Sequence, residues 1–225
     1  THLHTPAISI APTKELALLS HDAVLGNAPA SALILYSDGS LMDGRAGASL
    51  AWRRRPVEGE EDKEGWAFPA KGMAMGQHQP VYAAELVGVR LALSTISAML
   101  ASRSAPESAP TPIHLFLDNQ SAVLNSCSPA STSGQHLRRY NLTLYRSLLS
   151  AYPHVSLTVH WVPGHIGVEG NEAADAAAKT ASGRAVEGEE GGDEGEEGDG
   201  IDGMSGGELP KSRSALLAEF DLALP

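Results

Sequence analysis

The segment 155–164 constrains the fold more than any other, because it predicts a half-buried strand that stops before a glycine-rich loop. Residues 155–161 (VSLTVHW) alternate apolar and polar side chains, the period-2 pattern of a strand with one face in a core. Pro163 and Gly164 end the strand, because proline donates no ladder hydrogen bond and glycine adopts backbone angles that other residues avoid. The chain is therefore predicted to leave a sheet at this point.

A histidine and an aspartate follow on the loop and on the next predicted helix. Three glycines within seven residues make the loop around His165 mobile. The Ala-rich run 172–182 predicts a helix, with Asn171 as its N-cap. Asp175 then lies one turn inside this helix. A titratable histidine on a mobile loop above a helical aspartate indicates acid–base chemistry beside a metal ion.

The rest of the chain supplies further strands and helices in an order that predicts an α/β fold. The predicted strands cover residues 32–37, 46–53, 65–74 and 113–118. The predicted helices cover residues 82–101, 119–126 and 135–151, the last with an apolar side made of Leu137, Tyr140, Leu144, Leu148 and Leu149. Three antiparallel strands followed by parallel ones make a mixed five-stranded sheet with helices on its faces.

Glycine and proline indicate how the first strands connect. The first strand is expected to break at Asp38, where a Gly-Ser pair follows. A turn at Asp43 and Gly44 predicts a hairpin with the second strand. Pro69 implies that the third strand lies at a sheet edge or carries a bulge.

Composition divides the chain into four segments. Residues 1–30 are a lead-in with a short helix at 13–25, and residues 31–183 form the organised domain. Residues 184–213 are an acidic, Gly-rich linker that cannot bury a core, and residues 214–225 form a further short helix. The histidines of the lead-in have no other ligand at metal spacing and are interpreted as solvated, namely His2, His4 and His21.

The net charge of −11 argues at first sight against a nucleic-acid partner. Residues 187–202, however, hold nine acidic and no basic residues, so the remainder has 27 − 9 = 18 acids against 16 Lys and Arg. The folded part is therefore close to neutral. Charge neither supports nor excludes a polyanionic substrate, and we interpret 187–202 as a flexible spacer that discourages non-specific nucleic-acid contact.

The single cysteine, Cys127, excludes an internal disulfide and a cysteine-based zinc site. A reducing, intracellular compartment is the default, without a choice between nucleus and cytoplasm. We expect no membrane span or signal peptide, because no apolar run approaches membrane length and the N-terminus lacks the required layout. The chain begins with Thr1, and we expect a monomeric fragment of a longer polypeptide.

Four acidic residues occupy equivalent places in the predicted elements. Asp38 and Asp118 terminate the first and fourth strands, and Glu85 and Asp175 lie near the starts of two helices. If those strands are sheet neighbours, all four carboxylates converge. Such a cluster is costly unless cations neutralise it, and hard oxygen ligands suit Mg²⁺ or Mn²⁺. Two ions about 3.5–4 Å apart would clamp a phosphodiester, so the pattern indicates a phosphoryl-transfer site.

These residues sit in sequence blocks that resemble the type 1 ribonuclease H family. The blocks are YSDGS (36–40), AAEL (83–86), FLDNQSA (116–122) and WVPGHIGVEGNEAAD (161–175). The resemblance covers residues 31–183. SGQHLRRY (133–140) and the phrasing of the last block look most like the version in non-LTR retrotransposon polyproteins, beside a reverse transcriptase.

The resemblance implies a three-layer fold and an endonuclease that cuts the RNA strand of RNA·DNA hybrids. It makes metal ligands of Asp38, Glu85, Asp118 and Asp175, which would hold two Mg²⁺ ions, with Mn²⁺ as a possible substitute. His165 becomes a loop base that moves protons and helps to release product. The implied substrate contacts are Gly39, Ser40, Asn119 and Gln120. Asn171 and Glu172 would support the site. The implied partners are the hybrid and a covalently linked reverse transcriptase domain.

The chain departs from the cellular pattern in its expected grip on the hybrid. Residues 79–82 (QPVY) stand where cellular enzymes carry asparagines, and no basic, Trp-rich protrusion is evident between the second and third helices. Phosphate contacts or a solvated face are equally expected for Arg53, Arg54, Arg55, Arg138 and Arg139. Core positions are expected for Trp52 and Trp161, and Cys127 is interpreted as structural or inert.

Two alternatives stay open. A catalytically silent domain of this fold could serve as a connector or nucleic-acid-binding module, although the complete set of acids argues against it. Integrase-like or exonuclease relatives would keep the metals and change the substrate, but they lack the phrase around His165.

Overall fold

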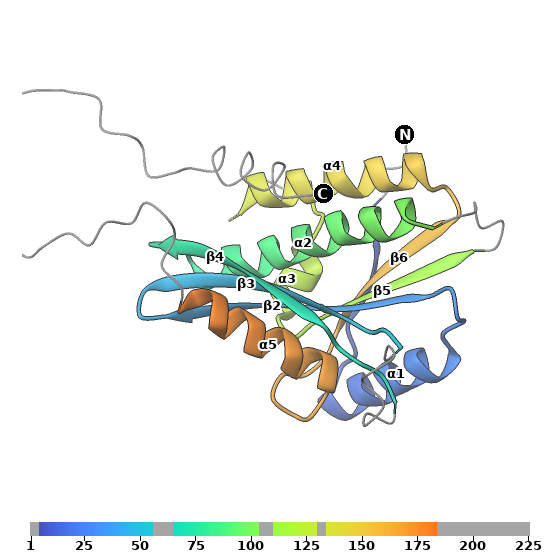
Figure 1. Cartoon of the computed structure of the whole chain (residues 1–225), viewed down its shortest axis with the longest axis horizontal. Helices are drawn as coiled ribbons and strands as arrows, with labels where there is room; N and C mark the ends of the chain where they lie inside the picture. The colour runs from blue at the N-terminus through green and yellow to red at the C-terminus, as the bar shows by residue number, and fades with distance from the viewer. Residues whose placement is uncertain (1–4, 56–64, 104–109, 130–133, 184–225) are drawn as a thin grey trace, which may run out of the picture. The chain divides into compact units, whose positions relative to one another are not determined.

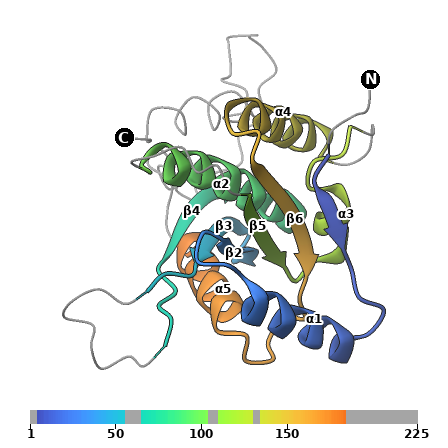
Figure 2. The same ribbon diagram turned by 90° about the vertical axis from the view of Figure 1, so that its right-hand side faces the viewer.

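The computed structural model describes residues 5–55, 65–103, 110–129 and 134–183, in which a mixed sheet carries helices on both faces (Figures 1 and 2). The strands are β1 (Ala7–Ser9), β2 (Leu33–Met42), β3 (Arg45–Trp52), β4 (Ala70–Gln77), β5 (Thr111–Leu117) and β6 (Val155–Trp161). The helices are α1 (Lys14–Asn27), α2 (Val81–Ala101), α3 (Gln120–Asn125), α4 (Gln135–Ala151) and α5 (Glu169–Ser182). The predicted linker and terminal helix after residue 183 lie outside the described residues.

The sheet has six strands in the described residues, in the order β1-β6-β5-β2-β3-β4. The hairpin strands β2, β3 and β4 pair antiparallel, whereas β1, β6, β5 and β2 pair parallel. The predicted mixed α/β sheet is therefore confirmed. The predicted number of five strands is wrong, because β1 adds a strand beside β6.

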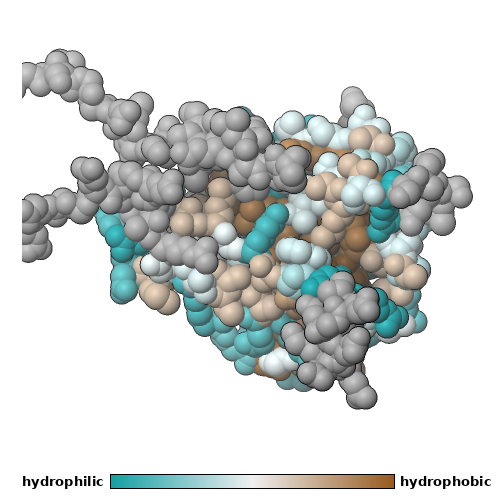
Figure 3. All heavy atoms as spheres, in the orientation of Figure 1, coloured by the Kyte–Doolittle hydropathy of each residue, from teal (hydrophilic) through white to brown (hydrophobic). Residues whose placement is uncertain are grey.

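Helices cover the two faces of the sheet in separate pairs. In Figures 1 and 2, α2 and α4 lie over one face, and α1 and α5 lie over the other. Polar residues line the margin of the coloured surface in Figure 3, and apolar residues show mainly toward its middle. This layered arrangement buries both faces of the parallel strands, as α/β sheets require.

The N-terminal segment is part of this arrangement. Thr13 caps α1 by accepting a hydrogen bond from the Leu16 amide at 3.3 Å. The helix buries Ala17 and His21, and the His21 Nε2 lies 2.9 Å from the Tyr36 hydroxyl. The interpretation of His21 as solvated is therefore wrong, because this histidine packs against the aromatic side chains of β2 and β5. His2 and His4 lie outside the described residues.

Strand β2 continues through the position where a break was expected. Asp38 pairs with Ser49 of β3, and the ladder continues to the turn. Asp43 and Gly44 have φ angles of 49° and 75°, which confirms the predicted hairpin turn. The prediction of a strand end at Asp38 is wrong, because pairing with β3 holds the Gly-Ser pair in the ladder. Asp38 therefore lies inside a paired strand and not at its end.

The third predicted strand is shifted along the chain. β4 begins at Ala70, after Pro69, and forms an edge of the sheet as the proline implied. Upstream of it, only an isolated bridge between Arg54 and Ala67 is found in the described residues.

Helix α2 is the central helix of the core. It is long and apolar enough to cross a membrane by length and composition alone, and 78% of its apolar stretch is buried inside the protein. The expectation that no apolar run approaches membrane length is therefore wrong. The extent of burial, however, is typical of a helix in a protein core. Glu85 and Arg90 are buried in it as well.

Helix α4 has the predicted bounds but not the predicted buried side. Its buried residues are Arg138, Asn141, Leu142, Tyr145 and Leu148. The Asn141 amide donates to the carbonyls of Leu86 at 3.0 Å and Ser126 at 3.1 Å, and Arg138 donates to the Ser128 hydroxyl at 3.2 Å. Hydrogen-bonded polar residues thus form much of the buried side, which a pattern of apolar residues cannot locate. Arg138 is fully buried, so it is not available as a phosphate contact.

Candidate active site

Three of the four predicted carboxylates meet at one place. Asp38 comes from β2, Asp118 follows β5, and Glu85 projects from α2, with ligand atoms that all lie within 4.8 Å of one another. The parallel pairing of Tyr36 with Phe116 explains the meeting, because each aspartate lies two residues further along its strand. The sheet therefore sets the spacing of the aspartates, and α2 brings the glutamate to them.

Burial makes this cluster electrostatically costly. Asp38 and Glu85 are only 6% and 4% exposed. Burial, together with the charge of Asp118, raises the pKa of Asp38 to about 7. Burial and the charges of both aspartates raise the pKa of Glu85 to about 9, and burial also raises the pKa of Asp118. The cluster retains protons at neutral pH unless a cation replaces them.

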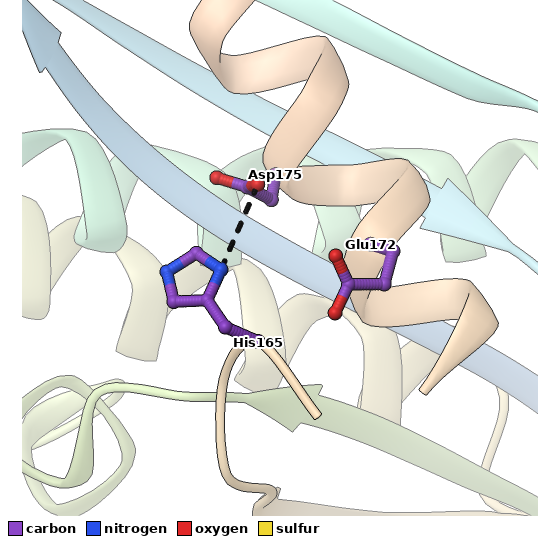
Figure 4. A group of neighbouring side chains, drawn as sticks. All are labelled: His165, Glu172 and Asp175. Carbon is purple, nitrogen blue, oxygen red and sulfur yellow. Dashed lines mark ion pairs between the residues drawn. The ribbon is translucent and has the colours of Figure 1, made fainter. Parts of the chain in front are cut away.

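The fourth carboxylate, Asp175, lies at the side of the cluster. Its side chain is in hydrogen-bonding contact with that of Asp38, and its charge also reaches Asp118. Asp175 belongs to a second group with His165 and Glu172, whose ligand atoms also lie within 4.8 Å of one another (Figure 4). The four predicted ligands are thus arranged as three together and one adjacent.

His165 lies on the loop between β6 and α5, and its side chain is 68% exposed. Its φ angle of 56° is left-handed, and the following Gly167 has a φ of 83°. The ring points toward α5, with Nδ1 4.0 Å from Asp175 Oδ2 (Figure 4). Gly164 packs directly on the Asp118 carboxylate, where a side chain would collide. The loop therefore supports Asp118 and presents an accessible imidazole.

Asn171 and Glu172 both contact the site or its loop. Helix α5 begins at Glu169 with Val168 as its N-cap, so the prediction that Asn171 caps the helix is wrong. Asn171 is buried in the first turn, where its side chain hydrogen-bonds the Asp118 carboxylate and offsets part of the rise in pKa that burial causes there. Glu172 accepts a hydrogen bond from the Gly167 amide at 3.3 Å. Both residues are placed to orient the site.

The predicted substrate contacts differ in their surroundings. Gly39 packs on the backbone of α2, where a Cβ would lie 2.6 Å from the Glu85 nitrogen. The Ser40 hydroxyl lies 3.4 Å from that of Ser182. Asn119 caps α3 by accepting from the Ala122 amide at 3.1 Å and also hydrogen-bonds Glu85. Gln120 is exposed.

A model of the RNase H family matches residues 30–183, about two thirds of the chain. The chain belongs to the RNase H family. It is therefore a ribonuclease H enzyme, from a family that uses divalent metal ions and binds RNA·DNA hybrids.

A search of solved structures also finds similar chains. RNase H1 from the halophilic archaeon Halobacterium salinarum is 22% identical, with 67% of this chain and 96% of that chain covered and a TM-score of 0.44. The N-terminal RNase H domain of a Mycobacterium tuberculosis protein is 18% identical, covers 67% and 98%, and has a TM-score of 0.44. The protease–reverse transcriptase of prototype foamy virus is 17% identical, covers 68% and 21%, and has a TM-score of 0.47. A comparison with curated proteins finds no match.

The RNase H carboxylates fit a divalent cation. All donors of the buried group are carboxylate oxygens, the type that Mg²⁺ and Mn²⁺ prefer. The Glu85 Oε2 is buried without a hydrogen-bond partner. A buried polar atom in this state needs a partner that the protein itself does not provide, and a cation would satisfy it.

Three supporting contacts in this RNase H were not predicted. The Trp161 Nε1 donates to the Asp118 carbonyl at 2.9 Å, and the Ser49 hydroxyl donates to the Ala174 carbonyl at 2.7 Å. Lys179 donates to Asp175 at 2.7 Å. The i, i+4 spacing of the last pair could have been found in the sequence, whereas the first two contacts join distant segments.

The other arginines expected to contact phosphates lie after β3 and on α4. Arg53 and Arg55 lie over the Trp66 ring, with guanidinium carbons 4.1 Å and 4.3 Å from the ring centre. Arg139 is exposed on α4. Phosphate contact stays a prediction for these residues.

Proposed function

We propose that this RNase H hydrolyses the RNA strand of RNA·DNA hybrids with two divalent metal ions, Mg²⁺ under cellular conditions, and that Mn²⁺ can substitute. The observation that carries the proposal is the convergence of Asp38, Glu85 and Asp118, with Asp175 beside them. The products would be a 3′-hydroxyl and a 5′-phosphate.

The carboxylates would share the ions unequally. Asp38, Glu85 and Asp118 would hold one ion, and Asp175 would hold the other together with Asp38, which it contacts. Bound ions of this kind activate a water and stabilise the leaving oxygen of a phosphodiester. Binding would also remove the electrostatic cost of the buried charges.

The chain's own residues would position these ligands and move protons. Asn171 and Trp161 fix Asp118 from its side chain and its backbone, and Asn119 fixes Glu85. The exposed imidazole of His165 would exchange a proton with the reacting groups and with solvent. A general acid or base of this kind contributes typically 10²–10⁴-fold to a rate.

Selectivity for the hybrid would come from the 2′-hydroxyl and from A-like helix shape. Gly39, Ser40, Asn119 and Gln120 are the proposed contacts. Gln120 is exposed and follows directly after Asn119, which contacts Glu85. A nucleic-acid strand that reached the carboxylates would therefore pass Gln120.

We further propose that the domain works beside a reverse transcriptase in a retroelement polyprotein, in an intracellular compartment. The phrase around His165 supports this context, and the single cysteine is compatible with reducing conditions. The sequence that flanks this chain in its gene is the direct test, because an upstream reverse transcriptase would be found there.

The reaction is tested with an Asp118→Asn variant. We expect the wild-type protein to cut the RNA of an end-labelled hybrid in Mg²⁺, and the variant to lose this activity while its circular dichroism spectrum is unchanged. Duplex DNA and single strands serve as control substrates. Full activity in the variant would refute the mechanism, and hybrid binding without cleavage in Mg²⁺ or Mn²⁺ would indicate a silent binding module.

A further inference from the structure

The Lys179 ammonium forms an ion pair with Asp175, which is one of the proposed metal ligands. Its Nζ lies 2.7 Å from Asp175 Oδ2, one helical turn away on α5. His165 Nδ1 faces the same oxygen atom at 4.0 Å. The Lys179 side chain is 49% exposed and that of Asp175 is 14% exposed, so the ammonium reaches inward from solvent to the carboxylate.

The lysine distinguishes Asp175 from the other carboxylates. Asp38, Glu85 and Asp118 already lie within 4.8 Å of one another, as a ready set of ligands. Asp175 is instead grouped with His165 and Glu172 and is held by an ammonium group. A divalent ion that bound Asp175 would compete with that ammonium, because both cations are attracted to the same carboxylate.

We propose that Lys179 is a positioning residue that makes the two ion sites unequal, so that the three-carboxylate site fills first and the Asp175 site fills only when an ion displaces the lysine. This inference rests on the proposed two-ion function. The displacement is inexpensive, because the lysine stem is long and its head is already half in water. Exposed ion pairs of this kind change an equilibrium constant by up to about fivefold.

The test measures Mn²⁺ binding to the protein without hybrid, by isothermal titration calorimetry. Lys179→Met keeps the apolar stem and removes the charge, whereas Lys179→Arg keeps the charge. Lys14→Met, at the exposed start of α1, is the matched control for a change in net charge. We expect two binding steps in the wild-type protein. The weaker step should tighten about three- to fivefold in Lys179→Met, with the tighter step and the Lys14→Met control unchanged.

The outcomes separate this inference from the proposed function. A second step that appears only in Lys179→Met would also support the inference, because the lysine would then block the site completely. An unchanged or weakened second step would overturn it while leaving the two-ion proposal in place. A single step in every variant would overturn both the inference and the two-ion proposal, and hybrid cleavage would still report whether the chain is an active ribonuclease.

Discussion

Replacement of Glu85 by glutamine should stabilise the metal-free protein at neutral pH, although it removes a proposed metal ligand. The pKa of Glu85 is raised from its ordinary value of 4.5 to about 9, first by burial and then by Asp38 and Asp118. Above pH 4.5 the unfolded chain loses this proton, whereas the folded chain keeps it until about pH 9. The stability that this carboxyl contributes is therefore fully present below the lower pKa. It is lost progressively as the pH rises from the lower pKa through the upper one.

The magnitude follows from this window. At pH 7 the pH is 2.5 units above the unfolded pKa of 4.5, which corresponds to about 3 kcal/mol of lost stability. Glutamine has the same shape without the charge, but its buried amide needs partners and offsets part of the gain. We expect a net stabilisation of about 1–2 kcal/mol, or a rise in Tm of roughly 2–8 °C.

Thermal unfolding followed by circular dichroism, in a chelator at pH 7 and pH 5, measures the effect. Glu169→Gln is the control, because Glu169 is exposed in the first turn of α5 and should cost only a few tenths of a kcal/mol. At pH 5 the advantage of Glu85→Gln should fall below about 1 kcal/mol, since the pH is then only slightly above the unfolded pKa of 4.5 and the wild-type protein has lost little stability. Added Mg²⁺ should stabilise the wild-type protein more than the variant.

A specific result would refute this reasoning. If Glu85→Gln melted at or below the wild-type temperature at pH 7, the buried carboxylates would not be a source of instability. A gain of equal size at both pH values would point to packing instead of charge.

Two further predictions concern histidines. His165→Ala should slow hybrid cleavage by about 10²-fold or more without abolishing it, because the imidazole lies beside the proposed metal ligands and is not one of them. Single-turnover cleavage rates measure this effect. A rate as low as that of Asp118→Asn would contradict the division of roles. Burial, followed by the charges of His114 and His21, lowers the pKa of His160 from 6.5 to about 4, so stability should be present above pH 6.5 and be lost as the pH falls toward 4. His160→Phe should make Tm less sensitive to acid over this range, and an unchanged acid dependence would show that His160 is not responsible.

The sequence predicts elements best where local pattern and tertiary contacts agree. The alternating run of β6 and the helix α4 have the expected bounds, and β2 and β5 are sheet neighbours, the condition on which the predicted meeting of Asp38 and Asp118 depended. The break at Asp38 was wrong because a Gly-Ser pair resembles a turn locally, while pairing with β3 keeps it extended. Local propensity could not include that partner strand.

The remaining errors have a similar cause. Asn171 looks like a cap, but the helix starts two residues earlier and the side chain instead hydrogen-bonds Asp118 across the fold. The buried side of α4 contains Arg138 and Asn141, whose burial depends on hydrogen bonds to other elements. The roles of the site residues stay predictions, because geometry places side chains and only the reaction tests what they do.

The unit that folds and the unit that the family shares have different boundaries in this chain. β1 and α1 precede the matched residues 30–183, yet β1 covers an edge of β6, and α1 carries His21 against Tyr36 and Phe116. A fragment cut at residue 30 would present an open strand edge and exposed aromatic rings, both of which promote aggregation. Each aromatic ring stands two residues before an aspartate of the cluster, so a segment outside the family-matched residues packs against the strands that carry the active-site aspartates.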